Sequence, residues 1–340
     1  MMNLDWSKLG FSYIETKSHI RYRWRNGQWG EGELVSGEPY LNIHIAATAL
    51  HYGQAAFEGL KAFACKDGKV RVFRLDENQK RMAVTASRIL MPEVPESMFR
   101  EAVLEVVRDN IDYVPPYGTG GSLYIRPLLI GTGPRIGVQP ADEYIFLVLV
   151  IPVGNYYKGG LQPVSALIID GYDRTAPCGL GNVKVAGNYA ASLEPQRIAK
   201  EKGFPINLYL DPAQHKYIDE FGTSNFIAID SEGRYVTPDS PSILPSITNK
   251  TLQQLAREKG IEVCRRPILL DEVETFREVA ACGTAVVITP VNRIVYRDRE
   301  IRCGSPDDQG VGPIFRELYH MVRGIQVGEI EDKWGWLTEV

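Results

Sequence analysis

Cysteine is scarce in this sequence, and its pattern argues against two kinds of site. The five cysteines are odd in number, widely spaced and without a CxxC pair: Cys65, Cys178, Cys264, Cys282 and Cys303. Neither a disulfide framework nor a structural zinc site is therefore expected. The five histidines form no HxxxH or HxH pair, so the sequence predicts no metal centre. Unpaired thiols are typical of a reducing compartment, which favours the cytoplasm.

Long apolar runs and an excess of basic charge are also lacking. The longest apolar run spans residues 144–153, which is about half of what a membrane helix needs. Residues 1–10 lack the basic-then-apolar pattern of a signal peptide. The net charge of −4 gives no basic surface for nucleic acid. We therefore expect neither a membrane nor a nucleic acid as a partner.

The composition that remains is that of an ordinary globular protein with two domains. The chain has 340 residues, of which 44% are hydrophobic and 24% charged, and this length favours two domains. The apolar run is followed by GNYYKGGLQP at 154–163, a stretch typical of a linker. We predict a small N-terminal domain at 1–153 and a large C-terminal domain at 164–340, both of the α+β class.

Hydrophobic spacing in the N-terminal half predicts two helices and two strands. The helices are expected at 76–91, where Pro92 follows, and at 97–110. A strand is expected at 122–130, with Tyr124 and Arg126 on the same face because side chains alternate along a strand. The continuous apolar run 144–153 indicates a second strand, buried on both faces.

The C-terminal half shows shorter patterns. Strands are expected at 164–170, 206–211, 225–230 and 285–289, with a hairpin turn at 231–233. A helix at 252–259 should end at Gly260, the position where glycine commonly terminates helices. Residues 188–202 have a helical composition, but Pro195 should kink this segment or split it in two.

Lys184 is a candidate for covalent chemistry. It lies in GLGNVKVAGNY at 179–189, where apolar neighbours would remove water from the amine and lower its pKa. A neutral amine is what Schiff-base formation requires. The alternative is a solvated lysine in a glycine-rich loop, and for Lys184 taken alone that alternative is favoured.

Glu220, within IDEFGTSN at 218–225, is a candidate partner for the pyridine nitrogen of a cofactor. A carboxylate there would keep the nitrogen protonated, so that the ring could accept electrons from a substrate. The alternative is a solvated acid in a turn, for which Asp219 would serve equally well.

Three features could bind an anion. Residues 246–248 (SIT) precede a helix, whose first backbone N–H groups are suited to a phosphate. Residues 283–285 (GTA) could form a second backbone cradle, and Arg81, in the first turns of the 76–91 helix, could pair with a phosphate. A plain helix cap and a solvated arginine are the alternatives. No stretch fits GxGxxG or GxxxxGK[ST], so a dinucleotide or P-loop site is not expected.

Five motifs together resemble those of the branched-chain amino acid aminotransferases. In the order of that family they are 50–63 (LHYGQAAFEGLKAF), 122–131 (SLYIRPLLIG), 187–189 (GNY), 220–225 (EFGTSN) and 283–285 (GTA). The resemblance extends from about Phe11 to Val327. It implies a class IV aminotransferase with the two-domain α+β architecture of PLP fold type IV, the D-amino acid aminotransferase-like fold. The implied cofactor is pyridoxal 5′-phosphate (PLP).

The resemblance also implies which residues bind the cofactor. Lys184 matches the Schiff-base lysine, which moves the proton between the substrate Cα and C4′, and Glu220 matches the acid at the pyridine nitrogen. Tyr189 matches the tyrosine that hydrogen-bonds the phenolic oxygen. A phosphate-binding set and one further arginine complete the group: Arg81, Ile247, Thr248 and Thr284, with Arg174.

The substrate residues follow in the same way. Arg126 matches an arginine that helps to bind the distal carboxylate of 2-oxoglutarate or glutamate, and Ala285 matches a backbone N–H donor to the α-carboxylate. The residues matching the aliphatic pocket, with one further substrate-binding position, are Phe57, Tyr124, Tyr189, Thr223 and Tyr156. Three positions match residues that reach the pocket from a partner subunit, which implies a homodimer or a higher homo-oligomer: Tyr52, Ile136 and Val138.

The implied reaction transfers the amino group of L-leucine, L-isoleucine or L-valine to 2-oxoglutarate, giving 2-oxo acids and L-glutamate. Two alternatives are a different class IV enzyme, such as a D-amino acid aminotransferase or an aminodeoxychorismate lyase, and a non-catalytic PLP-binding protein. The sequence departs from the family in three places. Val286 and Thr289 stand where some animal members have a redox CxxC, so that form of regulation is not expected. Asn249 replaces an arginine that many relatives carry after Gly-Ile/Val-Thr/Val, and Pro195 is unusual within its helical segment.

Overall fold

A computed structural model describes residues 4–154, 161–304 and 311–340 of the chain. The chain divides into two compact units. Unit 1 comprises Met1–Tyr156, Val183–Gly187 and Gly324–Val340, and unit 2 comprises Tyr157–Asn182 and Asn188–Arg323. The expected linker at 154–163 lies mostly outside the described residues, so the boundary there stays a prediction. Unit 1 therefore includes the short segment that carries Lys184.

Unit 1 is built on a nine-stranded sheet in the order β18-β6-β5-β7-β8-β1-β2, with β3 paired to β1 and β4 to β7. All of its pairings are antiparallel. The strands are β1 (Ser18–Arg25), β2 (Gln28–Trp29), β3 (Glu33–Ser36), β4 (Ala55–Phe57), β5 (Leu60–Ala64), β6 (Val70–Phe73), β7 (Ser122–Gly131), β8 (Tyr144–Val153) and β18 (Leu337–Glu339). The two strands expected in this half, β7 and β8, are confirmed. β8 is buried along nearly its whole length because β7 and β1 flank it.

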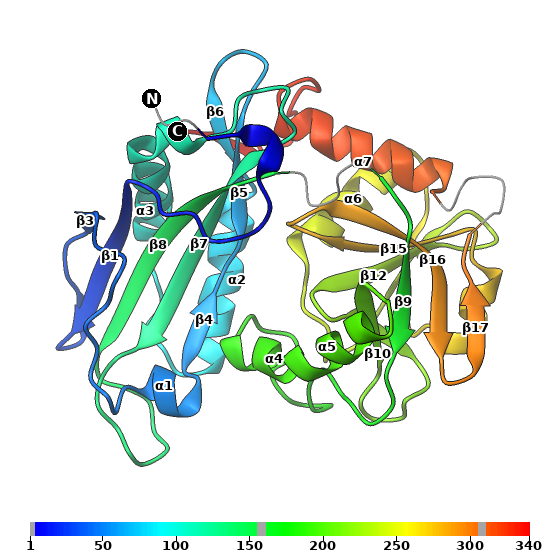
Figure 1. Cartoon of the computed structure of the whole chain (residues 1–340), viewed down its shortest axis with the longest axis horizontal. Coiled ribbons are helices and arrows are strands. Elements are labelled where there is room, and N and C mark those ends of the chain that lie inside the picture. Colours follow the sequence, from blue (N-terminus) through cyan, green and yellow to red (C-terminus); the bar gives the residue numbers. More distant parts are fainter. Residues whose placement is uncertain (1–3, 155–160, 305–310) are drawn as a thin grey trace. The chain divides into compact units, whose positions relative to one another are not determined.

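Helices α2 (Leu75–Arg88) and α3 (Glu96–Asp109) cover one face of this sheet (Figure 1). Their apolar sides pack with Leu123 and Ile125 of β7 in one buried cluster. The opposite face of β7 carries Tyr124 and Arg126, as period two predicts. Both expected helices are confirmed, although α2 ends three residues early, at Arg88. The shorter helical elements are η1 (Trp6–Lys8), α1 (Thr48–Tyr52) and η2 (Ile111–Tyr113).

Unit 2 is built on a second nine-stranded sheet, in the order β11-β10-β9-β16-β15-β12-β13-β14, with β17 paired to β16. Because β11 also pairs with β12, six of these strands close into a ring around an apolar core. The strands are β9 (Val164–Ile168), β10 (Ile206–Leu210), β11 (Ile218–Phe221), β12 (Ser224–Ile229), β13 (Tyr235–Pro238), β14 (Val263–Arg266), β15 (Glu278–Gly283), β16 (Val287–Tyr296) and β17 (Arg299–Arg302).

The helical segment that contains Pro195, expected to be kinked or split in two, is split. The segment forms two helices, α4 (Ala186–Ala191) and α5 (Leu193–Glu201), that are divided at Ser192. Pro195 is the third residue of α5, where its missing N–H has no partner within the helix to lose. The remaining helices are α6 (Ile247–Glu258), η3 (Leu270–Thr275) and α7 (Pro313–Gln326). Within the described part of the chain, no helix has the length and apolar character to span a membrane.

Most of the expected strands and turns of unit 2 are confirmed, whereas the helix expected at 252–259 begins earlier, because α6 spans Ile247–Glu258. The hairpin turn at 231–233 joins β12 to β13, and Gly260 follows α6 with a φ of +74°. The strand expected at 285–289 was wrong in its first two residues. Ala285 and Val286 lie in the turn between β15 and β16, because Gly283 pairs with Val287 across a tight hairpin.

Candidate active site

The backbone of Lys184 is held in unit 1 from two sides. Its carbonyl accepts from the N–H of Phe57 at 3.2 Å, and its N–H donates to the hydroxyl of Thr85 on α2 at 3.1 Å. The next residue, Val185, forms a bridge with Ala56 of β4. This backbone is therefore fixed between a strand and a helix, and the expectation of a solvated loop lysine does not describe it.

The amine of Lys184 lies against an aromatic face. Its Nζ is 4.6 Å from the centroid of the Phe57 ring. Burial lowers the pKa of this amine from 10.5 to about 8; the positive charge of Arg81 also lowers it, and the negative charge of Glu58 opposes the shift. A substantial fraction of the amine is therefore neutral at pH values where an ordinary lysine is almost fully charged.

Glu58 was not predicted from the sequence, yet it is paired directly with a predicted residue. Its carboxylate accepts from Nε and Nη2 of Arg81 at 2.7 Å each, and its side chain is fully buried. Such a two-bond pair fixes the plane and the position of the guanidinium. Glu58 lies within the motif at 50–63, but its neighbours gave no local signal that it would be buried against α2.

We expect Glu58→Gln to lower the pKa of the Lys184 amine further, because the negative charge of Glu58 raises that pKa. The change should also reduce the free energy of unfolding by up to about 3 kcal/mol, since it leaves the mostly buried Arg81 without a counter-charge. The pH dependence of acylation at Lys184, followed by mass spectrometry, and denaturant unfolding measure the two effects. The matched control is Glu33→Gln, which breaks the more exposed Arg21–Glu33 pair and should change neither quantity. If the pH dependence of acylation at Lys184 is the same in Glu58→Gln as in the wild type, this electrostatic account is contradicted.

Tyr124 and Arg126 form a second group near Phe57. Arg126 Nη2 donates to the Tyr124 hydroxyl at 3.0 Å, and the guanidinium lies 4.7 Å from the centroid of the Phe57 ring. Gly59 permits this packing, because a Cβ there would lie 2.2 Å from the Tyr124 hydroxyl oxygen. The buried Nε of Arg126 has no hydrogen-bond partner among the described residues. An aromatic wall thus surrounds a cation that can still donate a hydrogen bond to an anionic ligand.

Glu220 occupies β11 of unit 2, where it accepts two hydrogen bonds and forms one ion pair. Its Oε1 accepts from the N–H of Leu244 at 2.9 Å and pairs with Arg174 Nη2 at 2.8 Å. Its Oε2 accepts from Asn225 Nδ2 at 2.8 Å. Burial raises the pKa of Glu220 to about 7, and Arg174 opposes the rise most strongly. Asp219 instead binds the hydroxyl of Ser242, so the two adjacent acids have different partners.

The predicted anion-binding features also lie in unit 2. At the start of α6, the side chain of Ser246 accepts from the N–H of Asn249. The first two N–H groups of the helix, those of Ile247 and Thr248, have no acceptor within a regular helix. Thr284 and Ala285 lie half-buried in the β15–β16 turn. This turn ends at Val287, whose φ of +72° is costly for a β-branched residue, so its backbone is held against local preference.

The remaining predicted residues differ in exposure. Tyr189 is half-buried on α4, and Thr223 is exposed in the turn between β11 and β12. The three positions expected to serve a partner subunit are exposed in unit 1: Tyr52 (41%), Ile136 (73%) and Val138 (87%). The Tyr52 hydroxyl donates to the carbonyl of Ile136, which joins two of them. Tyr156 lies outside the described residues.

Comparison with known proteins places the chain in a family. The family model described as amino-transferase class IV matches residues 55–294. The branched-chain-amino-acid aminotransferase of Haemophilus influenzae is 48% identical over 346 residues, and the match covers the whole of both chains. The enzyme of the same name from Helicobacter pylori is 46% identical over 340 residues, covering 99% of this chain and 98% of the relative. This chain belongs to the branched-chain amino acid aminotransferases.

A solved structure supports the same assignment at the level of the fold. The PLP-bound crystal structure of the branched-chain amino acid aminotransferase from Thermobaculum terrenum matches with a TM-score of 0.75 and 26% identity, covering 95% of this chain and 98% of that chain. The α+β class IV fold predicted for this branched-chain aminotransferase is therefore confirmed, as is PLP as its cofactor. No group of three or more His, Cys, Asp or Glu side chains within the described ranges could hold a metal ion.

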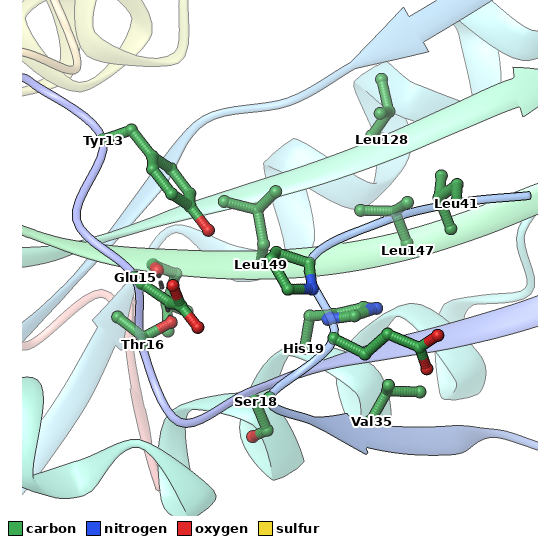
Figure 2. A pocket seen from close by; sticks show the side chains of 14 residues that line it. Tyr13, Glu15, Thr16, Ser18, His19, Val35, Leu41, Leu128, Leu147 and Leu149 are labelled. Atoms are coloured by element: carbon green, nitrogen blue, oxygen red, sulfur yellow. Dashed lines mark hydrogen bonds between the residues drawn. The ribbon is translucent and has the colours of Figure 1, made fainter.

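Unit 1 of this aminotransferase also contains a pocket of about 230 Å³ that the sequence did not predict. Leu128, Leu147 and Leu149 form an apolar floor, and Tyr13 and His19 lie at its edge (Figure 2). Burial and the charge of Arg21 lower the pKa of His19. None of the residues predicted to bind cofactor or substrate lines this pocket, although its Leu149 packs in the cluster that contains Tyr124 and pairs with Arg126 between β7 and β8.

Proposed function

We propose that this aminotransferase transfers the amino group of L-leucine, L-isoleucine or L-valine to 2-oxoglutarate, giving branched-chain 2-oxo acids and L-glutamate. The observation that carries the proposal is the Lys184 amine, with its lowered pKa, against the Phe57 ring on a backbone that is held from two sides. Tyr124 and Arg126 lie in the same group. An apolar wall beside a cation suits a site that must accept aliphatic and acidic side chains in turn. The names of the relatives support the same substrates.

The residues present fit PLP part by part. The bound cofactor supplies a ring that accepts electrons from the substrate Cα. Lys184 offers an amine for the covalent link, and Glu220 is a carboxylate that already accepts two hydrogen bonds and pairs with Arg174. Arg174 has a buried Nε without a partner among the described residues, as suits a cation close to a polar ligand. We assign phosphate binding to the guanidinium of Arg81, to the backbone N–H groups of Ile247 and Thr248 at the start of α6, and to Thr284 in the β15–β16 turn.

Each of these residues has a defined task in the reaction that we propose. With the cofactor bound, the Lys184 amine would carry the proton from the substrate Cα to C4′ of the cofactor. Glu220 holds the proton on the pyridine nitrogen, which makes loss of the Cα proton easier. Tyr189 donates a hydrogen bond to the phenolic oxygen of the cofactor. The second half of the reaction runs through the same steps in reverse, with 2-oxoglutarate as the amino acceptor.

The substrate would be oriented at both of its ends. By its resemblance to the family, the backbone N–H of Ala285 would bind the α-carboxylate, and Phe57, Tyr124, Tyr189, Thr223 and Tyr156 would contact the side chain of the substrate. Arg126 distinguishes the two substrates of the cycle, because only glutamate and 2-oxoglutarate carry a distal carboxylate. Its Nε would then gain the acceptor that it lacks among the described residues.

Arg126→Ala should raise the KM for glutamate and 2-oxoglutarate by about 100-fold, because it removes a charge-assisted hydrogen bond within a partly buried site. The KM for leucine should change much less, since leucine has no distal charge. Steady-state kinetics of the full reaction, with each substrate varied in turn, measure the difference in KM. Arg135→Ala, which alters a surface pair with Asp142, is the control. Equal losses for glutamate and leucine contradict this division of the pocket.

A panel of amino acid enantiomers with 2-oxoglutarate as acceptor tests the proposed function as a whole. We expect turnover with L-leucine, L-isoleucine and L-valine, and little with D-alanine or D-glutamate. Turnover confined to D-amino acids would identify a D-amino acid aminotransferase. Formation of pyruvate from aminodeoxychorismate would identify a lyase. Bound cofactor without any turnover would identify a non-catalytic PLP-binding protein, and each of these three results overturns the proposal.

The proposal extends to assembly and location. Ile136 and Val138 are highly exposed apolar side chains, and a second copy of the chain would cover them in a homodimer or higher homo-oligomer. Sedimentation measures the mass in solution, and a monomer would contradict this part. The free cysteines, of which three are buried, suit the reducing cytoplasm. Small-molecule substrates are the remaining expected partners.

A further inference from the structure

Asn249 has a defined environment, although it departs from the family pattern. It is the third residue of α6, and only 6% of it is exposed. Its side chain lies between α6 and β13: Asn249 Nδ2 donates to the Thr237 hydroxyl oxygen at 2.9 Å, and its Oδ1 accepts from the Tyr235 hydroxyl at 2.8 Å. Gln253, one turn further along α6, donates to the same Oδ1 at 3.0 Å. The amide therefore uses both of its ends inside unit 2.

A second amide connects Asn249 to the carboxylate of Glu220. Asn249 Nδ2 also donates to Asn225 Oδ1 at 3.2 Å. Asn225, directly opposite Glu220 in the β11–β12 pairing, donates from Nδ2 to Glu220 Oε2 at 2.8 Å and to the carbonyl of Leu244 at 3.0 Å. A continuous chain of hydrogen bonds thus leads from the hydroxyl of Tyr235 through two amides to Glu220.

The donor and acceptor roles in this series of hydrogen bonds are fixed by groups that can only accept or only donate. The hydroxyl of Thr237 donates to the carbonyl of Phe226 at 2.9 Å, and a carbonyl can only accept. The Thr237 oxygen must therefore accept from Asn249, which requires Nδ2 on that side. Asn225 must then present Oδ1 to Asn249 and Nδ2 to Glu220, and the Leu244 carbonyl requires the same orientation of Asn225.

We propose that Asn249 is a positioning residue for Glu220, acting through Asn225. By donating to Asn225 Oδ1, Asn249 keeps the amide nitrogen of Asn225 directed at the carboxylate. A reversed Asn225 amide would place an oxygen against that carboxylate and repel its charged form. The inference deepens the proposed function, on which it rests, because it adds a residue that keeps Glu220 ready to hold the pyridine nitrogen proton.

The need for such support comes from the burial of Glu220. Burial raises the pKa of this carboxyl to about 7, and the hydrogen bond from Asn225 is one of the contributions that lower it. A donor that is lost or reversed favours the neutral acid, which cannot pair with a protonated nitrogen. The arginine that many relatives carry at this position cannot make the same hydrogen bonds as Asn249. A guanidinium only donates, so it cannot accept from the hydroxyl of Tyr235.

Asn249→Leu and Asn249→Asp test the proposal in two ways. The first removes the side-chain donor at similar size, and the second replaces it with an oxygen that would attract the Asn225 amide nitrogen away from Glu220. The first readout is the pKa of Glu220 in the apoenzyme, from ¹³C NMR of glutamate-labelled protein with the signal assigned by its loss in Glu220→Gln. The second is the single-turnover rate of the PLP-loaded enzyme with leucine as a function of pH.

We expect the pKa of Glu220 to rise by roughly 0.5–1 unit in Asn249→Leu, because the Asn225 amide keeps only the Leu244 carbonyl to orient it and its hydrogen bond to Glu220 weakens. Asn249→Asp should raise it further, because it reverses Asn225 and adds a nearby acid. Single-turnover rates should fall in the same order, by roughly 5- to 10-fold for the leucine variant, with the acid limb of the pH profile moved to higher pH. Tyr235→Phe, the milder change, should act in the same direction to a smaller extent.

The matched control is Asn110→Leu, which removes another fully buried asparagine whose amide donates to Ser18 and Val106 in unit 1. It should lower stability while leaving the pKa of Glu220 unchanged. If Asn249→Leu, Asn249→Asp and Tyr235→Phe all leave that pKa unchanged, the inference is overturned, whatever their stability. Failure of the proposed function is separate: normal turnover in Glu220→Gln removes the role of Glu220, whereas the NMR titration needs no catalysis.

Discussion

Lys184→Ala should reduce transamination by roughly 10³-fold or more, because it removes both the covalent anchor and the group that carries the Cα proton. The amine is prepared for these tasks by its surroundings: burial and the charge of Arg81 lower its pKa, and hydrogen bonds on both sides hold its backbone. The visible absorbance that comes from the covalent link should also disappear. Steady-state kinetics with leucine and an absorption spectrum of the PLP-loaded variant measure the two losses.

Lys184→Arg tests whether a positive charge at this position is sufficient or whether a neutral amine is required. An arginine keeps the positive charge but remains protonated, so it should be as inactive as the alanine variant. Lys200→Ala, at an exposed position of α5, is the control and should behave as the wild type. Substantial turnover in either Lys184 variant, with the visible band retained, would assign the anchor to another lysine.

Glu220→Gln should lower kcat by roughly 10²- to 10³-fold, because a neutral amide does not stabilise the proton on the pyridine nitrogen. Binding of PLP should weaken only modestly, by less than about 10-fold, since the amide still makes a hydrogen bond. The direction follows from electrostatics: the charged carboxylate favours the protonated ring, and the variant removes that charge. Single-turnover kinetics and a PLP titration of the apoenzyme distinguish the two effects.

Glu232→Gln is the matched control for this change, because the Glu232 side chain is largely exposed beside Arg234. It should leave both kcat and PLP binding unaltered. A Glu220→Gln enzyme that loses PLP but turns over normally once saturated would show that the carboxylate only retains the cofactor. That outcome contradicts the assigned task of Glu220.

Much of the fold was predictable because local patterns and tertiary contacts agree. The 144–153 run became β8 with the expected bounds, since a strand flanked on both sides needs apolar residues throughout. Period two placed Tyr124 and Arg126 together. Pro195 was expected to disturb its helix, and the structure places it in the first turn of α5. The error at Ala285 arose because a tight hairpin, rather than β-propensity, decides those residues.

The candidate site was harder to predict from the sequence, because its residues are held by contacts between segments that are distant along the chain. Lys184, Glu220 and Arg81 were identified by their motifs. The burial of Glu58 against Arg81 was not, since 23 positions separate them and neither one indicates a pair. The importance of Asn249 was equally hidden. Its partners lie on β12 and β13, and only the packing of α6 on the sheet brings these three elements together.

Identification of the lysine that carries the cofactor tests the central claim most directly. Borohydride reduction of the PLP-loaded enzyme fixes the covalent link, and trypsin does not cleave after a modified lysine. If Lys184 is the anchor, mass spectrometry will find the cofactor on the peptide 175–197, which lies between Arg174 and Arg197 and contains an uncleaved Lys184. Cofactor found on any other lysine, with the peptide 175–184 released unmodified, would contradict the account.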